Sequence, residues 1–132
     1  MENQKAFTII ELIVVIAIIA VLAGIILANV MQYNTKGKDA AIKGQISQIR
    51  TAATDYFYTN GTYIGMCGSG TACNNARFNI INLGGSVGSN QQFSPSAYCM
   101  DFTLNSGTSW CVDNTSYIGS TDNCTSTHVS CQ

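Results

Sequence analysis

The sequence has little charge and few of the residues that usually carry chemistry. Among its 132 residues, six are lysine or arginine and seven are aspartate or glutamate, so the formal net charge is −1. So sparse and balanced a charge exerts no long-range attraction on a polyanion, and nucleic acid is not an expected partner. His128 is the only histidine, and no nucleophile stands beside a base in any recognisable arrangement. We therefore do not expect an enzyme.

Proline is also scarce, since Pro95 is the only one. Nothing in the first part of the chain therefore interrupts a long helix. A polar leader, residues 1–6, precedes an apolar segment, residues 7–30, in which Glu11 is the only charged residue. About 20 apolar residues in a helix span the hydrocarbon core of a bilayer, where an unpaired carboxylate costs free energy. Glu11 therefore needs a positive partner, and an amino terminus made by cleavage just upstream would supply one.

Residues 5–24 read KAFTIIELIVVIAIIAVLAG. They resemble the N-terminal signature of type IV pilins and of the related pseudopilins of type II secretion and DNA-uptake machines. The resemblance implies that a prepilin peptidase cleaves between Ala6 and Phe7 and methylates the new Phe7 amine. It also implies that Glu11 pairs with the Phe7 amine of a neighbouring subunit in a filament core, where opposite charges attract strongly. Ala6 stands where the family usually has glycine, and the proline that the family often has late in the apolar segment is absent.

The chain is predicted to have four parts: a leader at 1–6, a transmembrane and filament-core helix at 7–31, an amphipathic continuation of the helix at 32–60 and a disulfide-stabilised head at 61–132. In the third part, Ile42, Ile46 and Ile49 recur at helical spacing and form one apolar face. Asp39 and Lys43 lie four residues apart and are predicted to pair on the outer face of the helix.

The head is predicted to combine a short antiparallel sheet with loops. Residues 97–104 and 109–114 alternate as strands and flank a turn signal, which predicts a hairpin. Residues 65–75 and 84–96 are predicted loops, and residues 77–83 a short helix or strand. The expected fold class is therefore α+β: a long N-terminal helix, hydrophobic in its first half and amphipathic in its second, packed on a small head with disulfide-pinned loops.

All six cysteines lie in the head: Cys67, Cys73, Cys99, Cys111, Cys124 and Cys131. An even number of cysteines in a small exported domain indicates disulfides, and no C-x2-C pair suggests zinc. Local pairs, Cys67–Cys73 and Cys124–Cys131, are the first expectation and leave Cys99–Cys111. A two-residue turn at Ser106-Gly107 would place Cys111 opposite Phe102 and point Cys99 to the other face. A crossed pattern, in which Cys99 or Cys111 reaches the tail, therefore stays open.

No cofactor is expected. Calcium is the alternative, because one loop offers oxygens from Asp113, Ser116, Asp122 and Asn123. The loop lacks the regular acidic spacing of a calcium-binding loop, and a solvated turn is the preferred interpretation.

The resemblance implies a structural subunit of a type IV pilus-like filament used for adhesion, motility or contact. The precursor would cross the membrane once with its head outside the cytoplasm, and the mature form would lie in an extracellular surface filament. Its partners would be copies of itself, a prepilin peptidase and an inner-membrane assembly platform. Two alternatives stay open: a pseudopilin of a secretion or DNA-uptake machine, and an unassembled membrane-anchored binding protein that would not depend on Glu11.

Overall fold

The computed structural model describes residues 7–120, 124–125 and 129–132. The chain forms two compact units, Met1–Asn34 and Thr35–Gln132. Helix α1, Ile9–Asn60, contributes its first part to the first unit and its second part to the second. The predicted leader, residues 1–6, lies outside the described residues.

The first unit presents its apolar side chains to the surroundings. Every large apolar side chain from Phe7 to Met31 is at least 49% exposed. Within the described residues, α1 is the helix that is long and apolar enough to cross a membrane. Its most apolar window of 18 residues has a mean hydropathy of 3.2 and is not buried. An exposed apolar surface of this extent marks a segment that lipid or other protein covers.

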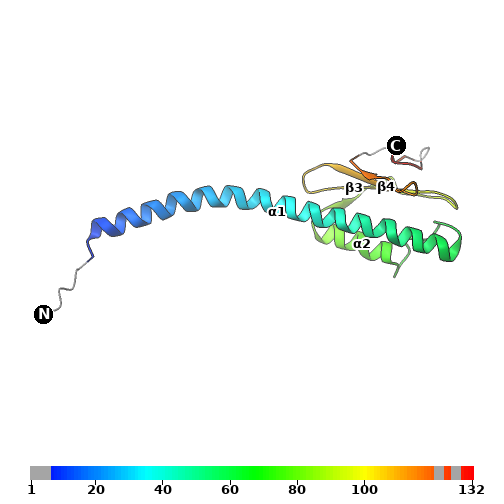
Figure 1. Cartoon of the computed structure of the whole chain (residues 1–132), viewed down its shortest axis with the longest axis horizontal. Coiled ribbons are helices and arrows are strands. Elements are labelled where there is room, and N and C mark those ends of the chain that lie inside the picture. The colour runs from blue at the N-terminus through cyan, green and yellow to red at the C-terminus, as the bar shows by residue number, and fades with distance from the viewer. Residues whose placement is uncertain (1–6, 121–123, 126–128) are drawn as a thin grey trace. The chain divides into compact units, whose positions relative to one another are not determined.

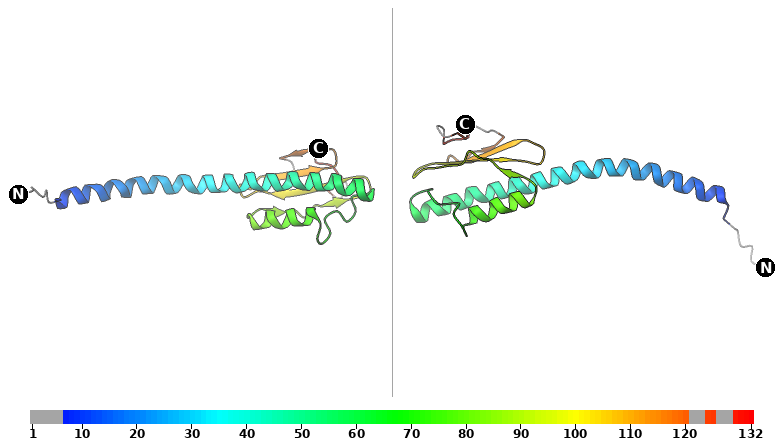
Figure 2. Two further views of the ribbon diagram at one scale, coloured as in Figure 1. Left: turned by 60° about the horizontal axis from the view of Figure 1, so that its bottom comes forward. Right: turned by 180° about the vertical axis from the view of Figure 1, so that it is seen from behind.

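The second unit has two layers, one of helices and one of strands. The second part of α1 and helix α2, Ala72–Asn82, lie side by side against one face of an antiparallel sheet, and the C-terminus lies on the other face (Figures 1 and 2). The sheet has five strands in the order β1-β3-β4-β5, with β2 pairing with the same strand β3. The strands are β1 (Ser86–Val87), β2 (Gln92–Phe93), β3 (Tyr98–Thr103), β4 (Ser109–Asp113) and β5 (Ile118–Gly119). The predicted α+β fold, with a long N-terminal helix, a small antiparallel sheet and disulfides in the head, is confirmed.

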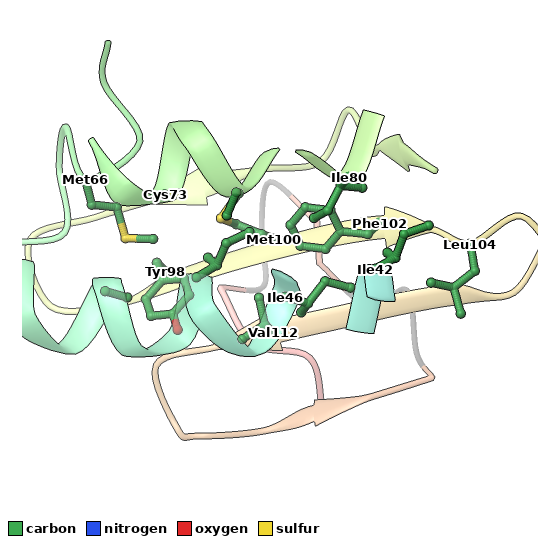
Figure 3. Packing of buried hydrophobic residues seen from close by; sticks show 13 residues of the cluster. Ile42, Ile46, Met66, Cys73, Ile80, Tyr98, Met100, Phe102, Leu104 and Val112 are labelled. Carbon is green, nitrogen blue, oxygen red and sulfur yellow. The ribbon is translucent and has the colours of Figure 1, made fainter. Parts of the chain in front are cut away.

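The core of the second unit lies between its two layers. Ile42, Ile46 and Ile49 of α1 are fully buried, which confirms the apolar face predicted for this part of the helix. They meet the inward side chains of β3, whose residues Met100 and Phe102 alternate with outward ones as the pleat of a strand requires (Figure 3). The remaining buried members of this cluster are Ala53, Met66, Cys73, Ala76, Ile80, Tyr98, Leu104 and Val112.

Helix α2 begins inside a segment predicted to be a loop. The Thr71 side chain accepts a hydrogen bond of 3.2 Å from the Asn74 backbone N–H, which makes Thr71 the N-cap. Cys73, Ala76 and Ile80 then face the core at helical spacing. The prediction of a loop over 65–75 is therefore wrong in its last residues, because the glycine-rich sequence before Thr71 concealed a short apolar stripe.

The β3–β4 hairpin has a longer loop than predicted. The Leu104 N–H donates to the Thr108 carbonyl at 3.0 Å, and the Gly107 N–H donates back to the Leu104 carbonyl at 2.9 Å. Gly107 has a φ of +81°, a conformation that glycine adopts without cost. Three residues therefore lie between the hydrogen-bonded Leu104 and Thr108, and the last of them is a left-handed glycine, which is a common hairpin form. The predicted two-residue turn is wrong.

The extra residue shifts the strand register by one. Cys111 lies opposite Asp101 and not opposite Phe102, while Cys99 lies opposite Asp113. Because side chains alternate between faces, Cys99 and Cys111 share the face of the sheet turned away from the helices. Their Sγ atoms are 3.7 Å apart.

This shared face determines the disulfides. The structure has three, Cys67–Cys73, Cys99–Cys124 and Cys111–Cys131. The local pair at the start of the head is the expected one. The tail pair Cys124–Cys131 is wrong, because both strand cysteines face the tail and each takes one of its cysteines. The crossed pattern that the sequence left open is the one the structure has.

Asp39 joins α1 to the hairpin loop. Its carboxylate accepts hydrogen bonds from the backbone N–H groups of Asn105 at 2.8 Å and Ser106 at 3.2 Å. Burial would raise the pKa of Asp39, but hydrogen bonds from Ser106 and Asn105 outweigh it and hold the pKa below its usual value. Lys43 instead places its Nζ 4.1 Å from the centroid of the Trp110 ring. The predicted Asp39–Lys43 pair is therefore wrong.

Candidate assembly site

The start of α1 is organised by a reciprocal pair of residues. The Thr8 backbone N–H donates to Glu11 Oε2 at 2.9 Å, and the Thr8 hydroxyl donates to the same oxygen at 2.7 Å. The Glu11 backbone N–H donates to Thr8 Oγ1 at 3.3 Å. This is a capping box, in which two otherwise unpaired helix N–H groups are satisfied by side chains.

The capping box fixes where the Glu11 carboxylate lies. Thr8 contacts only Oε2, and among the described residues Oε1 has no hydrogen-bond partner. One oxygen of the carboxylate is thus held against its own helix, and the other is open to a donor from outside. A cationic amine is a strong partner for such an oxygen, because a charge-assisted hydrogen bond is about twice as strong as a neutral one.

Phe7, the residue predicted to follow the cleavage point, precedes the helix and is 76% exposed. Ala6, on the other side of the predicted cleavage point, lies outside the described residues. Thr8 was missed by the sequence reasoning. The signal was present, since Thr8-x-x-Glu11 directly before an apolar run is the sequence pattern of a capping box.

Asp113 was a candidate calcium ligand, but in the structure its carboxylate accepts hydrogen bonds from other groups of the protein. The side chain is fully buried. Its Oδ1 accepts from the Thr115 N–H at 2.8 Å, the Thr115 hydroxyl at 2.6 Å and the Tyr117 N–H at 3.3 Å. Its Oδ2 accepts from the Cys131 N–H at 2.8 Å and the Ser130 hydroxyl at 3.3 Å. Burial would raise the pKa of Asp113, but the hydrogen bonds from Thr115, Cys131 and Tyr117 outweigh it and lower the pKa.

Both Asp113 oxygens are therefore engaged by protein donors within the head. Ser116, the second candidate ligand, is exposed in the turn after β4. The other calcium candidates, Asp122 and Asn123, lie outside the described residues, as does His128.

Comparison with known proteins gives matches in both sequence and family. A family described as a prokaryotic N-terminal methylation motif matches residues 1–27. The chain is 28% identical over 116 residues to the type IV wide pilus major component PilA4 of Thermus thermophilus, covering 83% of this chain and 81% of that protein. The chain is therefore similar to type IV pilins.

Two further pilin relatives come from Moraxella bovis. Fimbrial protein Q is 30% identical over 97 residues, which cover 64% of this chain and 62% of the relative. The type IV major alpha-pilin is 42% identical over 52 residues, which cover 39% of this chain and 33% of the relative. No solved structure matches this chain. The relatives support a pilin-type structural subunit.

Proposed function

We propose that this protein is a type IV pilin, the subunit of an extracellular surface filament, assembled through the exposed helix of its first unit after cleavage between Ala6 and Phe7. The observation that supports the proposal most is the capped Glu11 carboxylate at the head of an apolar surface. Every large side chain of that surface is exposed. A helix that served only as a membrane anchor would gain the cap from Glu11, but it would still bear the cost of a carboxylate without a positive partner beside its apolar segment.

Apolar contact alone does little to fix the axial register between the helices of a filament. Burying apolar surface from water yields about 25 cal/mol per Å². That gain is mostly absent when the helix leaves lipid, which already covers its side chains. Glu11 supplies the missing specificity in our proposal, because its open Oε1 takes the Phe7 amine of an adjacent subunit. One such pair per subunit fixes the axial register between helices that would otherwise slide.

The precursor in this proposal waits in the membrane with residues 7–31 as its single span and its disulfide-bonded head outside the cytoplasm. A prepilin peptidase cuts the leader and methylates the Phe7 amine, and an inner-membrane assembly platform extracts the subunit. The filament then acts in adhesion, motility or contact. Disulfides in the head fit this location, because they persist in oxidising compartments.

The experiment compares wild type with Glu11→Gln in cells that supply the peptidase and the export machinery. Glutamine keeps the shape of the side chain and removes its charge. We expect at least about a tenfold loss of pilin in the sheared surface fraction, the factor that corresponds to 1.4 kcal/mol. Asp55→Asn removes an exposed carboxylate from the second unit and serves as the matched control, with filaments retained.

Mass spectrometry of the sheared material tests the processing step. A chain that begins at Phe7, with or without one added methyl group, supports the proposal. Filaments that keep Met1 would contradict the cleavage assignment, and Glu11→Gln filaments at wild-type yield would contradict the proposed pairing. Pilin that appears in the sheared fraction only in traces, and is needed for secretion or DNA uptake, would favour a pseudopilin.

A further inference from the structure

The second unit has a polar groove that the assembly site does not use. It is an open hollow of about 380 Å³ along α1, bordered on one side by Ser116 in the turn between β4 and β5. Six residues line it: Arg50, Thr51, Thr54, Asp55, Tyr58 and Ser116. The volume is that of a site for a small ligand, for which clefts of about 300–1,000 Å³ are usual.

The groove carries one cation and one anion that do not neutralise each other. Among the described residues, neither the Arg50 guanidinium nor the Asp55 carboxylate has a hydrogen bond or an ion pair. The hydroxyls of Thr51 and Thr54 donate to the Ser47 and Arg50 carbonyls, so only their oxygen lone pairs face a ligand. The groove therefore offers donors at Arg50 and acceptors elsewhere.

One wall of the groove is fixed in an unusual conformation. Ser116 has a φ of +71° and is the only non-glycine residue with positive φ in the described part of the chain. Such a conformation costs free energy and persists only where its surroundings impose it. Here the buried Asp113 carboxylate imposes it by holding the N–H groups of Thr115 and Tyr117, one on each side. The wall is thus set before any ligand arrives.

Tyr58 completes the groove with an aromatic ring that is 87% exposed.

We propose that the groove binds a carboxylated saccharide. The Arg50 guanidinium takes the carboxylate in a two-pronged contact, which its planar fork favours over a lysine. Asp55 accepts hydrogen bonds from the sugar hydroxyls, and the ring of Tyr58 covers the apolar face of the sugar, as an aromatic side chain with a polar tip does at wet interfaces. This activity goes beyond filament formation and needs no filament.

Binding is measured by saturation-transfer NMR and calorimetry on the full chain in detergent micelles. The probes are sialyllactose and digalacturonate, which carry carboxylates, and lactose, which is neutral. We expect at least one carboxylated probe to bind at least tenfold more tightly than lactose. Arg50→Gln should weaken binding of that probe at least tenfold. Asp55→Asn and Tyr58→Ala should each weaken it severalfold. Lys36→Gln removes the same charge from an exposed position of α1 outside the groove and should bind as wild type does.

Each contrary result overturns the proposal. It fails if wild type binds neither carboxylated probe more tightly than lactose. It also fails if Arg50→Gln binds the carboxylated probe as tightly as Lys36→Gln does. Loss of filaments in Arg50→Gln together with no probe binding by wild type would assign the groove to contact between subunits. Because the assay uses dispersed protein, a negative result leaves the filament proposal intact, and a failure of Glu11→Gln to affect filaments leaves this one intact.

Discussion

The Asp113 carboxylate accepts a 2.8 Å hydrogen bond from the backbone N–H of Cys131, a residue 18 positions further along the chain. A single buried acid on β4 therefore holds both the turn that follows the strand and the segment that ends in a disulfide to Cys111. Charged acceptors form the stronger hydrogen bonds of a protein interior, so the loss of this one side chain affects two segments at once.

Asp113→Ala should therefore lower the free energy of unfolding by about 2–4 kcal/mol, since it leaves several buried donors without an acceptor. Urea unfolding in detergent, without reductant, measures the change through the fluorescence of Trp110, the only tryptophan. Asp55→Asn, which removes an exposed carboxylate with no described hydrogen bond, should stay within about 0.5 kcal/mol of wild type. Equal stability of the two variants would show that the Asp113 hydrogen bonds add nothing.

Acid should destabilise the head. The pKa values of Asp39 and Asp113 are lower in the folded protein than their ordinary value. Each group therefore adds stability that is complete above the unfolded pKa of about 3.9 and is lost as the pH falls through the folded pKa. The unfolding free energy should be flat from neutral pH to about pH 5 and then decrease. Asp39→Asn should be less stable than wild type at neutral pH, and its stability should fall less in acid. If its unfolding free energy falls with pH as steeply as that of wild type, Asp39 does not contribute to the acid sensitivity.

The capping box at the start of α1 should matter for assembly. Thr8→Val keeps the size of the side chain and removes the hydroxyl that Glu11 uses, at a cost of about 1 kcal/mol. We expect about a fivefold lower yield of sheared filaments, with Thr8→Ser close to wild type. Thr59→Val removes a hydroxyl that bonds to a helix carbonyl in the second unit and is the control. Equal yields from Thr8→Val and Thr8→Ser would mean that the cap has no part in presenting Glu11.

Two glycines should respond to alanine in opposite ways. A Cβ on Gly85 would lie 2.9 Å from Ile42 Cδ1 and 3.1 Å from the Thr103 carbonyl oxygen. Gly85→Ala should cost about 1–3 kcal/mol, because α1 and β3 leave no room. A Cβ on Gly44 would meet nothing within 4 Å, and this residue lies inside a helix. Gly44→Ala should stabilise by about 0.5–1 kcal/mol. Thermal unfolding of both variants measures these changes. A stabilising effect of Gly85→Ala would contradict the close packing of Gly85 against Ile42 and Thr103.

Long, periodic features of this protein were predictable from its sequence. The spacing of Ile42, Ile46 and Ile49 gave the buried face of α1, and alternation in β3 and β4 gave the hairpin. Three of the five strands have only two residues each, β1, β2 and β5, which is too short for a periodic signal. They exist because β3 and β4 offer free edges to pair with.

The predictions that failed, the Asp39–Lys43 pair and the strand register, depend on tertiary contacts and on one loop residue. Asp39 follows a helix spacing that suits a pair with Lys43, but the hairpin loop offers it two N–H donors and displaces that pair. The register error arose because the loop includes Asn105 in addition to the predicted Ser106 and Gly107, and this alone changed which face Cys99 was expected to occupy. Local composition does not contain either fact, since both depend on what packs against the segment.

The two bridges over the outer face of the sheet interlock along the chain, since Cys111 lies between Cys99 and Cys124, and Cys124 lies between Cys111 and Cys131. A protease that cuts the backbone once anywhere from Cys99 to Cys131 therefore releases no fragment, because at least one bridge still joins the two pieces. A subunit nicked in this region stays covalently whole, and the proposed filament would lose no material at the site of damage.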